Sequence, residues 1–150
     1  MSVAVMMPVP LSYYSPAVGG LPGAVRLGME PTYYWDALTE EVLGWLDANT
    51  PPDRRVATAT FPTSFLYLNE SGRLRSPISP LAPEPPSWFV IQNRSGSLDR
   101  LEQQLLQDRQ PIYVYKKLGV PLIWVFPYED VEAVRRERTT RPMMRGVLEP

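Results

Sequence analysis

The chain has 150 residues, 44% of them hydrophobic, which is enough to bury the core of a single domain. Its 15 basic and 16 acidic side chains give a net charge of -1, so composition provides no general drive toward nucleic acid or anionic lipid. Because histidine and cysteine are both absent, the sequence excludes zinc sites built on those residues, Ser-His-Asp triads, Cys-His dyads and redox dithiols.

Residues 1–35 form an N-terminal segment whose only charged side chains are Arg26 and Glu30. So little charge raises the question of a membrane span or a signal peptide. The prolines and glycines of this segment would interrupt a helix of about 20 residues, and no basic region precedes its apolar part. We therefore expect no transmembrane helix in this chain. If it comes from a membrane protein, we expect the spans to lie upstream.

Aromatic side chains and one arginine are the candidate site residues of this segment. They are Tyr13, Tyr14, Arg26, Tyr33, Tyr34 and Trp35. Tyrosine and tryptophan beside weakly charged backbone are typical of a membrane–water interface. The alternative is that these rings cover the domain's own core, the commoner role of aromatic side chains. The arginine could bind a lipid phosphate, although a salt bridge with Glu30, four residues on, is the simpler expectation.

From residue 36 the pattern changes to amphipathic helices and apolar strands. A helix is predicted to begin after Asp36, which is placed to cap it, and to end before Pro51. Its apolar face holds Leu38, Val42, Trp45 and Leu46. A strand over 55–61 and a short helix over 64–70, ended by Gly72, are predicted next.

The prolines of residues 76–87 predict an extended loop. Residues 88–93 then form a second predicted strand, whose near-continuous apolar run indicates burial on both faces, as in a parallel sheet. Ser97 is predicted to cap a helix that runs to Asp108.

Two β-rich runs, 112–115 and 121–126, flank a turn at Gly119 and are predicted to pair as an antiparallel hairpin. Pro127 is predicted to open a last helix over 128–136. This order predicts an α/β fold: a single domain with a small, mainly parallel sheet, helices on both faces and an antiparallel C-terminal hairpin.

We expect three regions along the chain. Residues 1–35 form a juxtamembrane-like segment, residues 36–134 the α/β domain, and residues 135–150 a basic flexible tail. The arginines of this tail could contact lipid phosphates, although a solvated chain end is the simpler expectation.

Carboxylates are the ordinary candidates for acid–base catalysis that remain in this composition. Those considered are Asp36, Glu40, Glu41, Asp47, Glu129, Asp130 and Glu132. Most of them lie in first turns or on polar faces of predicted helices, where capping and solubility explain them. The glycines of residues 19–28 match neither GxGxxG nor GxxxxGK and are better explained by sharp backbone turns. We therefore predict no catalytic residue, no metal site and no cofactor in this chain.

A series of short motifs links residues 10–36 to a known family. They are Pro10–Tyr14 (PLSYY), Gly19–Gly20, Gly23–Ala24, Gly28–Glu30 (GME) and Thr32–Asp36 (TYYWD). The series resembles the point where the last membrane helix of dolichyl-phosphate-mannose protein mannosyltransferases and aminoarabinose transferases passes into a soluble C-terminal domain. The later run GVPLIWVF is similar to the closing strand of those domains. Ser15 departs from the pattern, because the family usually has asparagine there.

The resemblance implies a parent enzyme that transfers a sugar from a polyprenyl phosphate to a protein or lipid acceptor at the outer face of a membrane. The family's catalytic carboxylates lie in a first external loop that this chain does not contain, so none is carried over. The resemblance favours the interfacial interpretation of the aromatic residues and an extracytoplasmic, membrane-associated location. The implied partners are the transmembrane part of the same protein, the membrane surface and a lipid-linked sugar.

Two other functions stay open at this point. One is a free-standing α/β module that binds a small molecule or a partner protein. The other is an enzyme that works with carboxylates alone.

Overall fold

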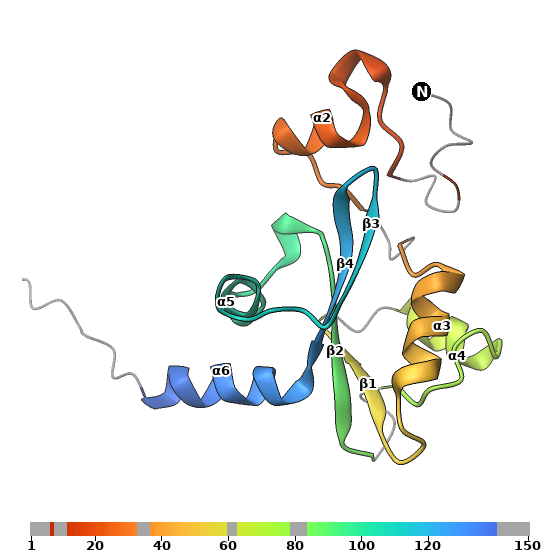
Figure 1. Cartoon of the computed structure of the whole chain (residues 1–150), viewed down its shortest axis with the longest axis vertical. Coiled ribbons are helices and arrows are strands. Elements are labelled where there is room, and N and C mark those ends of the chain that lie inside the picture. Colours follow the sequence, from red (N-terminus) through yellow and green to blue (C-terminus); the bar gives the residue numbers. More distant parts are fainter. Residues whose placement is uncertain (1–6, 8–11, 33–36, 60–62, 79–83, 141–150) are drawn as a thin grey trace, which may run out of the picture.

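A four-stranded sheet runs through the middle of the molecule (Figure 1). The computed structural model describes residues 7, 12–32, 37–59, 63–78 and 84–140, and the fold concerns that part of the chain. The strands are β1 (Arg55–Thr58), β2 (Pro86–Gln92), β3 (Tyr113–Lys117) and β4 (Val120–Pro127), in the spatial order β1-β2-β4-β3. The α/β class and the C-terminal hairpin are confirmed.

The sheet is mixed rather than mainly parallel. β1 and β2 pair in parallel, whereas β2–β4 and β3–β4 pair antiparallel. The reason is the position of β4, which lies between β2 and β3 and prevents these two strands of like direction from becoming neighbours. The antiparallel β3–β4 pair was predicted, and the difference from the predicted sheet is that the hairpin joins β2 through the antiparallel strand β4.

Helices cover both faces of the sheet, as predicted (Figure 1). On one face lie α3 (Glu40–Asn49) and α4 (Thr63–Glu70), and on the other α5 (Arg100–Asp108) and α6 (Tyr128–Thr140). β2 serves both layers: Val90 packs in one core cluster, and Phe89 and Ile91 pack in the other. Its continuous apolar run is thus explained by burial on both faces.

Two helix starts differ from the predicted ones. The N-cap of α3 is Thr39, because Ala37–Thr39 are buried and Thr39 has extended backbone angles; Asp36, the predicted cap, lies outside the described residues. The N-cap of α5 is Asp99, whose carboxylate accepts from the Glu102 amide while the Glu102 carboxylate accepts from the Asp99 amide. Ser97, predicted as that cap, belongs to the short 3-10 helix η3 (Ser95–Ser97).

The last helix and the hairpin are longer than predicted. α6 continues to Thr140, so residues 135–140, which were expected in a flexible tail, are helical; residues 141–150 of the expected tail lie outside the described residues. The strands of the hairpin extend to Lys117 and Val120, and only Leu118 and Gly119 remain in the turn. Both turn residues have positive φ, 51° and 79°, as a two-residue type I′ turn requires.

Two short helices, η2 (Pro16–Val18) and α2 (Gly20–Arg26), lie at the end of the molecule where the β3–β4 turn projects (Figure 1). In the described part of the chain, no helix combines the length and the apolar character that crossing a membrane requires.

Candidate functional site

The segment over residues 12–32, which we call the arm, carries most of the motif residues that the structure describes. Glycine allows its two short helices to meet at close range. Gly19 and Gly20 have φ values of 82° and 66° between η2 and α2. A Cβ atom on Gly23 would lie 1.8 Å from the carbonyl oxygen of Val18, a distance that no side chain permits. The glycines therefore shape the arm, as the sequence predicted for a sharp backbone turn.

Hydrogen bonds fix the arm to the loop that follows β2. The Tyr14 hydroxyl donates to the carbonyl oxygen of Glu30. The Glu30 carboxylate in turn accepts from the amide of Gly96 at 2.7 Å and from the Ser95 hydroxyl at 3.3 Å. The Thr32 hydroxyl donates to the carbonyl oxygen of Asn93 at 2.9 Å. The arm is consequently part of the folded domain rather than a loose leader.

Apolar contacts and one lysine join the arm region to the hairpin. Leu21 of α2 is fully buried in the core cluster that also holds Val120 and Leu122 of β4. The Lys117 ammonium donates to the carbonyl oxygen of Met7 at 2.7 Å, across 110 residues of sequence. The chain beginning and the hairpin tip thus form one end of the molecule.

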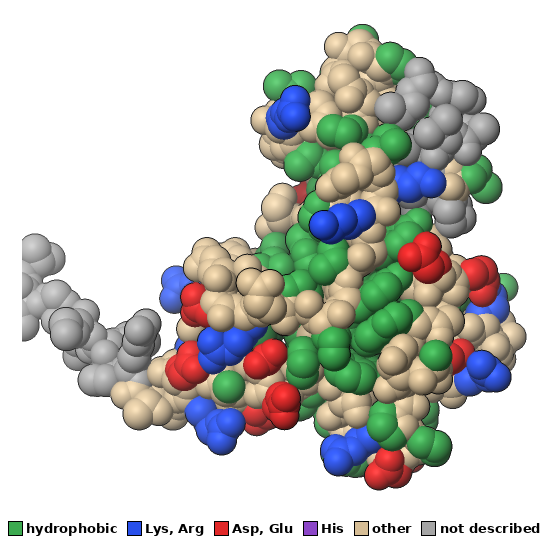
Figure 2. Space-filling view, in the orientation of Figure 1, with side chains coloured by type: hydrophobic (Ala, Val, Ile, Leu, Met, Phe, Trp, Pro, Cys, Tyr) green, Lys and Arg blue, Asp and Glu red, His purple; other side chains and the backbone are tan. Residues whose placement is uncertain are grey.

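This end, which we call the arm end, exposes apolar side chains beside cations. The exposed fractions are 57% for Met7, 68% for Leu27, 43% for Met29 and 39% for Leu118. Arg26 and Lys116 are exposed and Lys117 is half-buried. In Figure 2 the upper end shows blue and green side chains, whereas most red carboxylates lie lower, over α3, α5 and α6. Large exposed apolar side chains together with one sign of charge indicate an interaction surface.

The structure describes three of the six predicted site residues. Tyr13 and Tyr14 are half-buried and pack against the core cluster on the α3 side of the sheet. Arg26 is exposed at the C-terminal end of α2, where a cation is favourable. Tyr33, Tyr34 and Trp35 lie outside the described residues. The membrane contact of all six stays a prediction.

The expected salt bridge between Arg26 and Glu30 is absent from the ion pairs of the described residues. The helix that would bring the two side chains together ends at Arg26, and Gly28 turns the backbone with a φ of 78°. The Glu30 carboxylate instead binds the Gly96 amide. The Arg26 guanidinium therefore remains available on the surface.

The sequence predicted the turn at Gly119 but gave no indication that the hairpin tip belongs to a candidate site. Residues 116–119 read KKLG, and a leucine stands before the glycine where a type I′ turn favours asparagine. That departure is a signal that could have drawn attention to the tip. Its nearness to the arm could not be predicted, because the contacts between them are distant in sequence.

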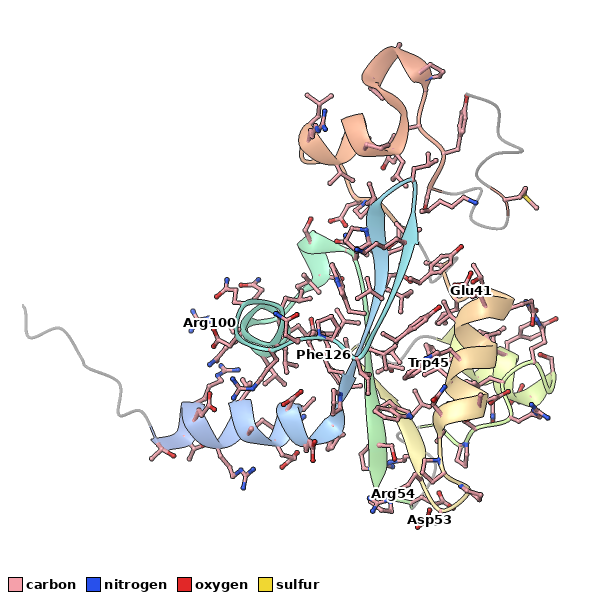
Figure 3. The ribbon with its side chains drawn as sticks, viewed as in Figure 1. Glu41, Trp45, Asp53, Arg54, Arg100 and Phe126 are labelled. Carbon is pink, nitrogen blue, oxygen red and sulfur yellow. The ribbon has the colours of Figure 1, made fainter. Side chains whose placement is uncertain are left out.

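A row of aromatic rings joins α3 to the sheet on one face. Trp45 stacks on Tyr113 with ring centroids 4.8 Å apart and meets Trp88 at 5.5 Å; Figure 3 shows Trp45 pointing from α3 toward the sheet. The Tyr113 hydroxyl donates to Glu41 at 3.2 Å. Burial, and then the negative charge of Glu41 and this hydrogen bond, raise the pKa of Tyr113 to about 12. These rings are bound to one another, so the row stabilises the fold.

The opposite end of the molecule carries a shallow hollow with a volume of 350 Å³. Its walls include Arg54, Trp88 and Tyr128, and Figure 3 shows Arg54 at this end, away from the arm. The polar tips of the two rings are already engaged: Trp88 donates to the carbonyl oxygen of Asn49, and Tyr128 accepts from Arg135. The two rings are therefore held by the protein itself, and the charged side chains that line the hollow are those of Arg54 and Glu129.

Several of the considered carboxylates bind neighbouring groups. Asp47 holds the backbone of Arg75 and Ser76, Glu41 accepts from Tyr113, and Asp130 and Glu132 pair with arginines. Among the residues that the structure describes, no group of three side chains could hold a metal ion. The arm end is thus the most distinctive candidate site. A comparison of the chain with known protein families, curated proteins and solved structures finds no match.

Proposed function

We propose that this chain is a non-catalytic, extracytoplasmic domain of a membrane glycosyltransferase. In this proposal the parent protein transfers a sugar from a polyprenyl phosphate to a protein or lipid acceptor. The domain covers the opening of the active site or helps to select the acceptor, and its partners are the transmembrane part of the same protein, the membrane surface and the lipid-linked sugar.

The observation that supports the proposal is the placement of the motif residues. The segment that resembles the membrane-proximal part of those enzymes is built into the arm end, beside Leu27, Met29 and Leu118, which are all exposed. Exposure of apolar side chains to water is unfavourable in free energy, whereas insertion into a lipid surface removes them from water. The resemblance and the exposed apolar side chains therefore both support the arm end as the end that would face the membrane in this proposal.

A non-catalytic role is supported by two acidic side chains that already bind backbone amides. Asp47 fixes a loop and Glu102 completes a helix cap. A general acid or base must reach the proton that it moves, and these groups are committed to backbone amides. In the proposal, the bond-making groups belong to the transmembrane part of the parent.

The proposal is tested with polyprenyl-phosphate-mannose and polyprenyl-phosphate-aminoarabinose as labelled donors. Membranes of the source cells are compared with membranes of cells in which the codons for residues 12–140 are deleted. We expect the deletion to abolish sugar transfer to the endogenous acceptors or to change which acceptors are labelled. The purified 150-residue chain is expected to turn over neither donor.

A Gly44→Ala allele serves as the matched control, because Gly44 lies on α3 with open space around it. That allele should transfer sugar as the wild type does. Unchanged labelling after the deletion, or turnover by the isolated chain, would contradict the proposal.

A further inference from the structure

The β3–β4 turn holds a leucine, Leu118, whose backbone conformation and exposure to water are both unfavourable for that residue. Leu118 has a φ of 51°, in the left-handed region, and its side chain is 39% exposed at the tip. Left-handed backbone costs a leucine more than it costs glycine or asparagine, which are the usual residues of this turn. Backbone strain at an exposed position indicates a functional reason for the residue.

Three cations lie on the described segments of the arm end. Lys116 and Lys117 precede Leu118 on β3, and Arg26 extends from the neighbouring arm. In the described part of the chain, none of the ion pairs involves these three cations. The nearest described acidic residue of the arm, Glu30, directs its carboxylate to the Gly96 amide. The arm end therefore attracts an anionic partner.

The shape of the surface favours lipid over a folded protein. The exposed apolar side chains of the arm end sit on separate segments: Leu118 on the hairpin turn, Leu27 and Met29 on the chain that leaves α2, and Met7 before the arm. A protein partner would need a matching pocket for each segment, since protein interfaces are closely complementary. A lipid surface admits separate apolar side chains between its headgroups and offers phosphates to the cations beside them.

We propose that the arm end binds an anionic lipid surface through two contacts, the β3–β4 turn and the end of α2. Leu118 and Leu27 enter the headgroup region, while Lys116 and Arg26 pair with lipid phosphates. This inference deepens the proposed function by naming the lipid class and the orientation of the domain, and it rests on that function only for the presence of a membrane nearby.

The test measures co-flotation of the purified chain with vesicles of phosphatidylcholine alone and of phosphatidylcholine mixed with phosphatidylglycerol. We expect binding to the anionic vesicles, and weakening of that binding by added salt. Lys116→Gln should weaken it about fivefold, the usual effect of one cation near such a surface. Leu118→Asn should weaken it by at least about fivefold through the loss of a buried apolar side chain.

Leu118→Asn separates lipid binding from folding. Asparagine suits the left-handed turn better than leucine, so this variant should melt at the same or a higher temperature while it binds vesicles less well. Ile112→Asn is the matched apolar control, because Ile112 is exposed before β3, far from the turn along the strand. Arg54→Gln at the opposite end is the matched charge control. Both controls should bind as the wild type does.

Equal binding to neutral and anionic vesicles, no binding at all, or full binding by folded Leu118→Asn and Lys116→Gln would overturn the inference. If Leu118→Asn does not fold, Lys116→Gln against Arg54→Gln decides the question alone. The flotation assay uses no sugar donor, so it is independent of the test of the proposed function. If the chain binds anionic vesicles but the deletion of residues 12–140 leaves sugar transfer unchanged, the proposed function is rejected and the lipid-binding inference is kept.

Discussion

The Asp47 carboxylate shows how one side chain of α3 fixes a distant loop. Its oxygens accept from the amides of Arg75 and Ser76 and from the Ser76 hydroxyl, at distances from 2.8 to 3.1 Å. The side chain is 6% exposed. Burial raises the pKa of this carboxyl, but the hydrogen bonds from Ser76 and Arg75 together outweigh burial and hold its pKa below the ordinary value.

The lowered pKa of Asp47 predicts how stability depends on pH. An acid whose pKa is lower in the folded state stabilises the fold above its unfolded pKa, and this contribution is lost as pH falls through the folded pKa. Below about pH 4 the free energy of unfolding should therefore fall more steeply for the wild type than for Asp47→Asn. Denaturant titrations at a series of pH values measure both slopes, and equal slopes would contradict the assignment.

Two glycines give opposite predictions for the same substitution. Gly23→Ala places a Cβ atom against the Val18 carbonyl, so the backbone of the arm must shift, at a cost of about 1–3 kcal/mol. Gly44→Ala adds a methyl group in open space inside α3 and should stabilise the protein by about 0.5–1 kcal/mol. Thermal unfolding of the two variants should move in opposite directions. If Gly23→Ala were as stable as the wild type and its arm unchanged, the arm would not require glycine at residue 23.

At the scale of the elements, α5 begins with a capping box that predicts the effect of two neighbouring substitutions. Asp99→Ala removes the side-chain acceptor of the Glu102 amide and should cost about 1 kcal/mol. Ser97→Ala should cost much less, because the Ser97 hydroxyl donates to a carbonyl of its own 3-10 turn and caps no helix. Urea unfolding measures the free energy of unfolding of both variants. A larger decrease for Ser97→Ala than for Asp99→Ala would instead support Ser97 as the N-cap, as the sequence predicted.

The elements that could be predicted are those with local signals. The apolar run of β2, the spacing of Val42 and Leu46, and the hairpin around Gly119 all depend on neighbouring residues, and the structure confirms them. The helix starts were misplaced because several capping residues stood close together in the sequence. The burial of Ala37 and Leu38 precedes the start of α3, and the capping box of Asp99 and Glu102 marks the start of α5. The sheet direction was misjudged because strand order depends on contacts that no local pattern records.

On the scale of the whole molecule, the arm end combines segments from opposite ends of the sequence. Motif residues and Arg26 could be singled out early, because low charge and clustered aromatic rings are visible in one stretch. Lys116 and Leu118 could not, because contacts distant in sequence, such as the packing of Leu21 with Val120 and Leu122 of β4, bring the hairpin beside the arm. Among the residues that define the candidate surface, Arg26 is therefore the one that the sequence had named as a site residue.

The position of β4 in the sheet also determines when the chain can fold during translation. Among the strands of the described sheet, β4 is synthesised last, yet both β2 and β3 pair with it. A nascent chain that ends at Lys117 can form only the short β1–β2 pair, and β3 has no neighbour to join. Cooperative folding must therefore wait until Pro127 has left the ribosome, and the growing polypeptide exposes the strand edge of β2 until then.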